Sequence, residues 1–214
     1  MKRFISILMS CICFAGFAKA EVTDLTGKDN VIYVSPVTAK AGETLKLSVC
    51  MKNTAEIRGF QFNLYLPDGV TIALNPKGKE IVSLNTERRD EFDEHTLSVK
   101  KQEDGSYMFL CGSLSEDVFL GNDGEIISVT LNIPTDMASG VYPLKIVNQK
   151  LTENDISKYY ETELVETTFT VSDATSVKEV NAEGVKADGK YLRHGRLVII
   201  KGGKEYSATG SVVK

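Results

Sequence analysis

Residues able to perform acid–base, nucleophilic or metal chemistry are few in this sequence of 214 residues. It has two histidines, His95 and His194, and neither has a partner at metal-ligand spacing. The short motifs of zinc proteases, phosphate-binding loops and serine hydrolases do not occur. A nucleophilic triad needs a base, and only His95 lies in the main body of the chain. The sequence therefore predicts no catalytic residue, no metal ligand and a protein that is not an enzyme.

The cysteines offer one further kind of chemistry, a disulfide. Beyond residue 20 the sequence holds only Cys50 and Cys111, which could pair in an oxidising compartment. Their bridge would close a loop of about 60 residues and stabilise the fold by about 4 kcal/mol through chain entropy. The alternative is two separate buried thiols that pack as small apolar groups. Both interpretations stay open, because a disulfide needs a Cβ geometry that a sequence does not show.

Carboxylates gather in the segment TERRDEFDE, residues 86–94. Calcium binds about six to eight oxygen atoms, so these acids could in principle hold a structural ion. The segment lacks the turn glycine of an EF-hand loop, and a solvated run of charges is the simpler interpretation. We therefore expect no cofactor. Other oxygen donors for calcium would be Asn122, Asp123, Glu125, Asn154 and Asp155.

The first twenty residues predict a signal peptide. Lys2 and Arg3 precede an apolar run over residues 4–17, and Ala18-Lys19-Ala20 forms a cleavage site. We expect a mature chain that begins at Glu21 and is exported to the periplasm, the cell surface or the medium. A competing interpretation uses residues 8–11 as a lipoprotein box, which would anchor the chain through Cys11.

The charge of the chain argues against binding to nucleic acid. Residues 1–20 hold three bases and no acid, so the remaining chain has 22 bases and 29 acids. Residues 21–172 alone carry 14 bases and 24 acids. Nucleic-acid binding needs a clustered positive surface, which this acidic body does not offer.

Hydrophobic periodicity predicts the elements that carry these residues. Almost every segment up to residue 172 alternates apolar and polar residues, and Gly or Asp-Gly turns separate segments about ten residues apart. This pattern is typical of an all-β, antiparallel two-sheet sandwich. Around residue 173 the pattern changes. We expect residues 21–172 to form the sandwich, residues 173–189 a linker, and residues 190–214 a short C-terminal β-hairpin appendage.

The body resembles the cohesin domains over about residues 28–172. The resemblance rests on VSPVTAKAGETLKLSVCMKN, IRGFQFNLYLPDGV, DGSYMFLCGS, GNDGEIISVTLNI and ASGVYPLKIVNQKL in this order. It implies a jelly-roll-like sandwich of about nine strands with no catalytic activity, whose partner is a protein such as a dockerin. It also suggests a link to polysaccharide utilisation. The C-terminal tail is similar to a reduced type IX sorting domain.

The strand GFQFNLYL, residues 59–66, carries the candidate binding residues. Phe60, Phe62, Leu64 and Leu66 alternate with polar neighbours and should face the core. The outward residues are Gln61, Asn63 and Tyr65. The resemblance implies that their face docks the partner. An ordinary solvated face is the alternative, because exposed polar residues need no explanation.

A carbohydrate-binding module on the same sandwich fold is a second functional hypothesis. Sugars stack on exposed aromatic rings, and Tyr65 or the pair Tyr159-Tyr160 would supply them. The chain has no tryptophan, which weakens this hypothesis.

Overall fold

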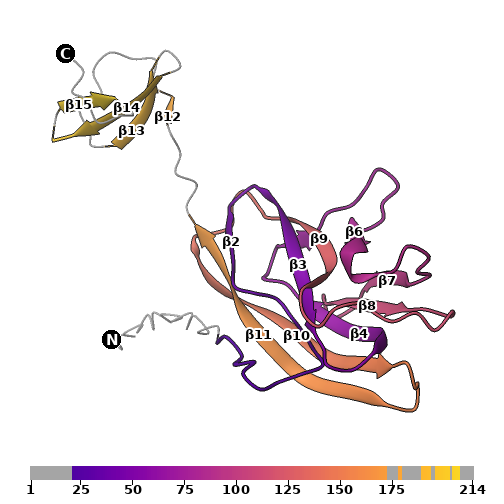
Figure 1. Cartoon of the computed structure of the whole chain (residues 1–214). Helices are drawn as coiled ribbons and strands as arrows, with labels where there is room; N and C mark the ends of the chain where they lie inside the picture. Colours follow the sequence, from indigo (N-terminus) through magenta and orange to yellow (C-terminus); the bar gives the residue numbers. More distant parts are fainter. Residues whose placement is uncertain (1–20, 173–177, 180–188, 194–195, 203, 208–214) are drawn as a thin grey trace, which may run out of the picture.

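A computed structural model describes residues 21–172, 178–179, 189–193, 196–202 and 204–207 of the chain (Figure 1). The predicted signal peptide lies outside the described residues, as does most of the predicted linker. Within the described part, the single helical element is one 3-10 turn at Thr86–Arg88. No helix among these residues has the length and apolar character needed to cross a membrane.

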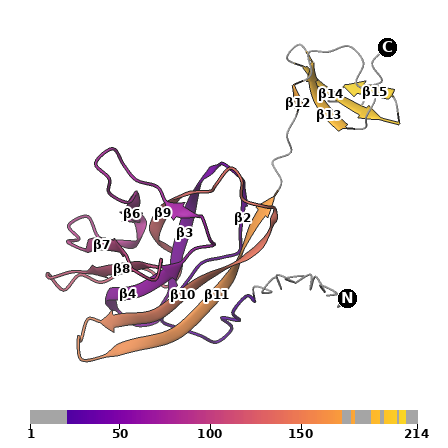
Figure 2. The ribbon, with the colours of Figure 1, turned by 180° about the vertical axis from the view of Figure 1, so that it is seen from behind.

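Two sheets pack against each other around one core (Figures 1 and 2). In the five-stranded sheet the order is β1-β3-β9-β5, and β6 also pairs with β9. Its strands are β1 (Val31–Tyr33), β3 (Thr44–Lys52), β5 (Thr71–Ile72), β6 (Val82–Leu84) and β9 (Glu125–Asn132). The order in the six-stranded sheet is β2-β11-β10-β4-β8-β7. Its strands are β2 (Val37–Lys40), β4 (Ile57–Tyr65), β7 (Thr96–Lys101), β8 (Tyr107–Gly112), β10 (Gly140–Glu153) and β11 (Tyr159–Ser172).

The predicted all-β sandwich is thus confirmed, with two differences in detail. Residues 21–172 form eleven strands instead of about nine, because several strands are only two or three residues long. The pairing is antiparallel except between β2 and β11, which run parallel. The chain passes from β1 to β2 through Pro36, which cannot donate to a sheet ladder, and so changes sheets there.

The core confirms the predicted register of β4. Phe60, Phe62 and Leu64 are at most 2% exposed, and Leu66 is partly buried against them. The ring of Phe62 stacks on Phe109 of β8, with 4.8 Å between centroids and 7° between planes. A one-residue slip of β4 would move all of these side chains to the opposite face.

A β-bulge in β10 locks the two sheets together. Its pairing with β4 shifts register between Val147 and Lys150, and Asn148 adopts a left-handed φ of 53°. The bulge turns the neighbouring Gln149 inward, where it is 1% exposed. The Gln149 amide accepts from Ile32 N–H at 2.8 Å and donates to Ile32 C=O at 2.9 Å. Gln149 thereby bonds β10 of one sheet to β1 of the other.

The charged segment after β6 is solvated at most of its acids, as the sequence interpretation expected, but not at Arg88 and Asp93. Arg88 is 6% exposed and its guanidinium donates to Asn53 Oδ1 at 2.7 Å. The guanidinium group is planar and holds five N–H donors in a rigid arrangement, which suits a site with many carbonyl acceptors. The backbone carbonyls it also binds belong to Met51, Leu120, Gly121 and Gly124. Arg88 therefore fixes the loop that leads into β9.

The C-terminal strands form a separate sheet with the order β12-β13-β14-β15. The strands are β12 (Lys178–Glu179), β13 (Gly189–Arg193), β14 (Arg196–Lys201) and β15 (Lys204–Ser207). This sheet contains the predicted hairpin, β13–β14, and adds a parallel partner, β12, from within the stretch predicted as linker. The likeness of this tail to a sorting domain stays a prediction.

Candidate functional site

The outer face of the six-stranded sheet carries all three binding residues predicted from the sequence. Gln61, Asn63 and Tyr65 lie on β4, which is flanked by β10 on one side and β8 on the other. Gln61 is exposed, and Asn63 and Tyr65 are half-buried. The structure thus brings them onto one surface, and their role in binding stays a prediction.

Two of these side chains are held in place by the turn between β7 and β8. The Tyr65 hydroxyl donates to Asp104 Oδ2 at 2.6 Å, and Asn63 Nδ2 donates to Ser106 Oγ at 3.1 Å. Ser106 Oγ donates in turn to Asp104 Oδ1 at 2.7 Å. The Tyr65 and Ser106 hydrogen bonds lower the pKa of Asp104 below its ordinary value of 3.8. Within the described residues Gln61 has no such partner, so its amide is available to a ligand.

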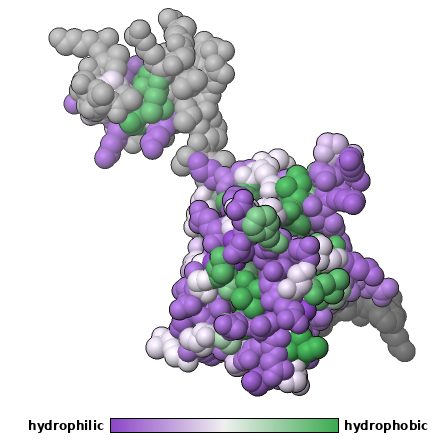
Figure 3. All heavy atoms as spheres, turned by 45° about the vertical axis from the view of Figure 1, so that its right-hand side comes forward, coloured by the Kyte–Doolittle hydropathy of each residue, from purple (hydrophilic) through white to green (hydrophobic). Residues whose placement is uncertain are grey.

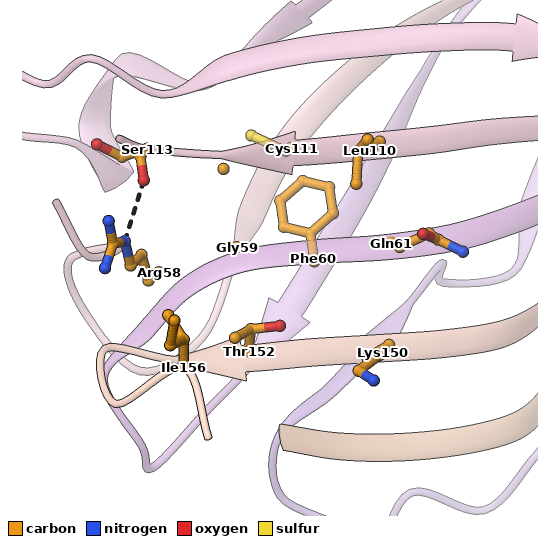
Figure 4. Close-up of a pocket in the computed structure, with 11 residues that line it drawn as sticks. Arg58, Gly59, Phe60, Gln61, Leu110, Cys111, Ser113, Lys150, Thr152 and Ile156 are labelled. Atoms are coloured by element: carbon orange, nitrogen blue, oxygen red, sulfur yellow. Dashed lines mark hydrogen bonds between the residues drawn. The ribbon is translucent and has the colours of Figure 1, made fainter. Parts of the chain in front are cut away.

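A hollow of about 290 Å³ lies beside Gln61 on the same face (Figure 4). Its floor exists because Gly59 of β4 pairs directly with Gly112 of β8, and neither has a side chain. The two glycines are not equivalent. A Cβ on Gly59 would meet the Cys111 carbonyl oxygen at 2.8 Å, whereas a Cβ on Gly112 would have no atom within 4 Å. The side chains around the hollow include Arg58, Gln61, Leu110, Lys150, Thr152 and Ile156.

Large apolar side chains are exposed around this hollow. Leu110 on β8 is 48% exposed and Ile156 in the β10–β11 turn is 70% exposed, and both line the hollow. Leu114, which follows β8 and is 95% exposed, does not line it. A space-filling view of one side of the molecule shows hydrophobic patches on a mainly hydrophilic surface (Figure 3). Exposed apolar groups gathered at one surface are typical of interaction sites.

The charged groups that line the hollow are both cationic. Arg58 Nε donates to the Ser113 carbonyl at 3.0 Å, which fixes the guanidinium at the rim (Figure 4). Lys150 Nζ lies 3.8 Å from a carboxylate oxygen of Glu161 and 3.7 Å from the Tyr159 ring centroid. Among the residues that the structure describes, no aspartate or glutamate lines the hollow.

The buried pair of Asp93 and His95 is hydrogen-bonded to the backbone of Arg58, which lines the hollow. His95 Nδ1 lies 2.5 Å from Asp93 Oδ2, and Nε2 donates to the Arg58 carbonyl at 2.8 Å. Asp117, together with these two residues, places its ligand atom within 4.8 Å of theirs. Asp117 already accepts from Ser113 Oγ at 2.6 Å and from Glu94 N–H at 2.9 Å. Each of these groups is thus engaged in structural hydrogen bonds, and Asp93 is not part of a solvated run of charges.

The two cysteines do not form the candidate disulfide in this structure. Cys50 of β3 and Cys111 of β8 are free thiols on strands of different sheets. Burial raises the pKa of the Cys111 thiol to about 12 and raises that of Cys50 as well. Both are therefore protonated near neutral pH and act as packing groups.

The tyrosines proposed to stack on sugars are each engaged within the protein, Tyr159 through its ring and Tyr65 and Tyr160 through their hydroxyl groups. The Lys150 ammonium lies over Tyr159, and the hydroxyl of Tyr160 is bonded to Glu153. The hydroxyl of Tyr65 is bonded to Asp104. The Lys150 ammonium thus argues against sugar stacking at Tyr159, whereas a bond to the hydroxyl of Tyr65 or Tyr160 does not cover the ring.

The fold is that of a cohesin-like domain. No family model and no curated protein matches the chain. A type I cohesin–dockerin complex from Clostridium thermocellum matches with a TM-score of 0.55 and 15% identity, over 67% of this chain and 99% of that one. The seventh ScaB type I cohesin from Pseudobacteroides cellulosolvens gives 0.52 and 18%, over 71% and 97%. CaCohA2 from Clostridium acetobutylicum gives 0.51 and 14%, over 68% and 94%. Because the sequence identities are this low, the structural likeness establishes the fold of the domain, which is that of the cohesins.

Sequence reasoning found the face but not the hollow. Gly59 and Gly112 are 53 positions apart, and only strand pairing places them side by side. The two glycines could have been noted as gaps in otherwise alternating strands, where glycine often marks a close approach of backbone. Ile156 was missed because it lies in a turn, where periodicity gives no signal.

Proposed function

We propose that this protein is a non-catalytic, cohesin-type binding module that docks a dockerin-like protein. The observation that carries this proposal is the outer face of β10-β4-β8-β7, where exposed Leu110 and Ile156 flank a hollow beside Gln61. Apolar groups at the centre and polar groups at the rim are the usual anatomy of a protein–protein interface. The solved neighbour from Clostridium thermocellum, which binds a dockerin, supports the class of partner.

The Asp93–His95 pair supports a function without catalysis. In a hydrolytic triad the second imidazole nitrogen must reach a nucleophile. Here Nε2 of His95 is bonded to the backbone carbonyl of Arg58, which cannot act as one. The His95 ring is also packed on Phe119, with 4.2 Å between centroids. The pair therefore supports the loop under the face and does no chemistry of its own.

We place this module outside the cytoplasm, at the cell surface, in the periplasm or in the medium. The support is the sequence of residues 1–20, with its basic start, apolar run and cleavage site. A role in polysaccharide utilisation is an extension of the same proposal, and its support is the resemblance of the sequence to the cohesin domains. Edman sequencing of the exported protein tests this location, and a mature start at Glu21 is the expected result.

Binding to a panel of purified dockerin domains, measured by biolayer interferometry, tests the function. We expect at least one domain to bind, and Leu110→Asp to weaken that binding by at least about tenfold, since it puts a charge into the apolar centre. Thr130→Asp, on the outer face of β9 in the other sheet, is the matched control. If Thr130→Asp abolishes binding and Leu110→Asp does not, the site lies on the other sheet. A glycan array with hits and a dockerin panel without any would favour the carbohydrate-binding hypothesis.

A further inference from the structure

The hollow over Gly59 and Gly112 has the size of a receptor for one side chain. Pockets for whole small molecules run from about 300 to 1,000 Å³, so a hollow of about 290 Å³ lies at the lower limit. It arises where two directly paired strand residues lack side chains, and paired residues have Cα atoms about 4.5–5.5 Å apart. Such a gap is about one side chain wide.

The walls of the hollow select an aliphatic group with a neighbouring negative charge. Leu110 and Ile156 supply apolar surface, and Figure 4 shows them on opposite sides of β4. The cations Arg58 and Lys150 complete the rim, with no acid among the lining residues, although the chain holds 29 acids and 25 bases. This local charge is opposite to the net charge of the chain.

Both cations retain capacity for a new partner. Arg58 forms no salt bridge within the described residues, and its two hydrogen bonds go to the carbonyls of Ser113 and Leu114. The pKa of Asp117 is lowered chiefly by hydrogen bonds from Ser113 and Glu94, and the charge of Arg58 contributes least, without an ion pair between the two. The Lys150–Glu161 pair is exposed and 3.8 Å long, and ion pairs of this kind contribute little.

We propose that this hollow is a specificity pocket for one branched aliphatic side chain of the partner, carried next to an aspartate or glutamate. The proposal rests on the proposed function and adds the chemistry that chooses among partners. The aliphatic group covers the paired glycines, and the neighbouring carboxylate meets Arg58 or Lys150 at the rim. Bidentate pairing of a carboxylate with a guanidinium adds direction to this contact.

Gly112→Leu is the decisive variant, because it fills the hollow without damaging the fold. A Cβ at this position meets no atom within 4 Å, and its φ is not in the left-handed region. The probe is a phage-displayed library of random twelve-residue peptides, selected on the immobilised full chain. Selected peptides are then titrated against the wild type, Gly112→Leu, Lys150→Gln and the control Thr130→Leu on β9.

The expected result is enrichment of peptides with Leu, Ile or Val beside Asp or Glu. Their affinity should fall at least about tenfold with Gly112→Leu and about threefold with Lys150→Gln, and should not change with Thr130→Leu. Circular dichroism confirms that each variant is folded.

Two other outcomes overturn the proposal in distinguishable ways. If peptides bind, lose affinity with Leu110→Asp and keep it with Gly112→Leu, the face is a docking surface and the hollow is not its pocket. If neither the library nor the dockerin panel gives any binder, the proposed function itself fails and the pocket fails with it.

Discussion

At the scale of single residues, the outer face of β4 combines one free side chain with two that are already positioned. Gln61 is exposed, whereas Asn63 and Tyr65 are bonded to the β7–β8 turn. A positioned side chain loses less conformational freedom when a partner arrives, which favours binding. Because Asp104 accepts the hydrogen bond from Tyr65, protonation of Asp104 at low pH should weaken this arrangement.

The first prediction concerns the titration of Asp104. Its pKa is lowered chiefly by the Tyr65 hydroxyl, so the ionised form is favoured in the folded state. The stability from this bond is fully present above the ordinary pKa of 3.8 and is lost as pH falls through the lower folded pKa. In Tyr65→Phe the pKa of Asp104 should therefore rise, as measured by carbon-13 NMR of its carboxyl group. An unchanged titration would show that the bond to Tyr65 does not form in solution.

The second prediction separates the two faces of β4. Phe62→Ala should lower the free energy of unfolding by about 3–5 kcal/mol, because it leaves a cavity against Phe109 in the core. Tyr65→Ala should have a much smaller effect and should weaken binding of the partner instead. Urea denaturation measures the first effect and interferometry the second. A larger loss of stability for Tyr65→Ala than for Phe62→Ala would mean that the faces are reversed.

At the scale of elements, the sandwich is closed by a side chain as well as by strand pairing. The bulge at Asn148 turns Gln149 inward, and Gln149 bonds both polar groups of Ile32. The amide acts here as a substitute for a paired peptide group, since its carbonyl oxygen accepts one hydrogen bond and its NH2 group donates another. The edge of β1 in the other sheet is thereby held against β10.

The third prediction concerns this connection. Gln149→Leu should lower the free energy of unfolding by about 2–4 kcal/mol, because it leaves two buried backbone groups without partners. Glu163→Gln, an exposed change on β11, is the control and should have almost no effect. Urea denaturation gives both values. Hydrogen exchange should also show faster exchange of the Ile32 amide in Gln149→Leu, and equal exchange would contradict the role assigned to Gln149.

The fourth prediction concerns the paired glycines of β4 and β8. Gly59→Ala should lower the free energy of unfolding by about 1–3 kcal/mol, since its Cβ would press on the Cys111 carbonyl oxygen. Gly112→Ala should be neutral or slightly stabilising, because the new methyl group meets open space and the unfolded chain loses freedom. The melting temperatures of the two variants, each compared with that of the wild type, measure both effects. Equal losses would mean that the strand register differs from the one described.

At the scale of the whole molecule, the sandwich and the C-terminal strands are built as separate sheets. No strand of β12–β15 pairs with a strand of the sandwich among the described residues. The core of the sandwich consists of residues between Val31 and Val171. A unit with its own core and its own sheets has what it needs to fold alone.

The fifth prediction follows from this separation. A chain that ends at Ser172 should unfold cooperatively with nearly the melting temperature of the full chain. Limited proteolysis of the full chain should cut first between Asp173 and Lys190, where the sequence is small and polar. Loss of cooperative unfolding in the shortened chain would show that the C-terminal strands are an integral part of the sandwich.

The sequence predicted those parts of the fold that depend on local pattern. Strict alternation from Phe60 to Leu64 gave the inward and outward faces of β4 correctly, because one face is buried and the other is not. Asp93 was wrongly assigned to a solvated charge run, because only the folded chain shows that His95 lies under it. The bulge at Asn148 was missed for a similar reason, since its cause is the distant backbone of Ile32.

Gly59 and Gly112 differ in the room available for a side chain, and this difference affects how such a module could evolve. Position 59 is held by the fold, because a side chain there collides with the neighbouring strand. At position 112 the fold imposes no such limit. A lineage could therefore exchange Gly112 for Ala, Val or Leu in single steps, and each step would reshape the receptor while the sandwich persisted. Duplicated copies could diverge in this way toward different partners within one cell and avoid cross-reaction.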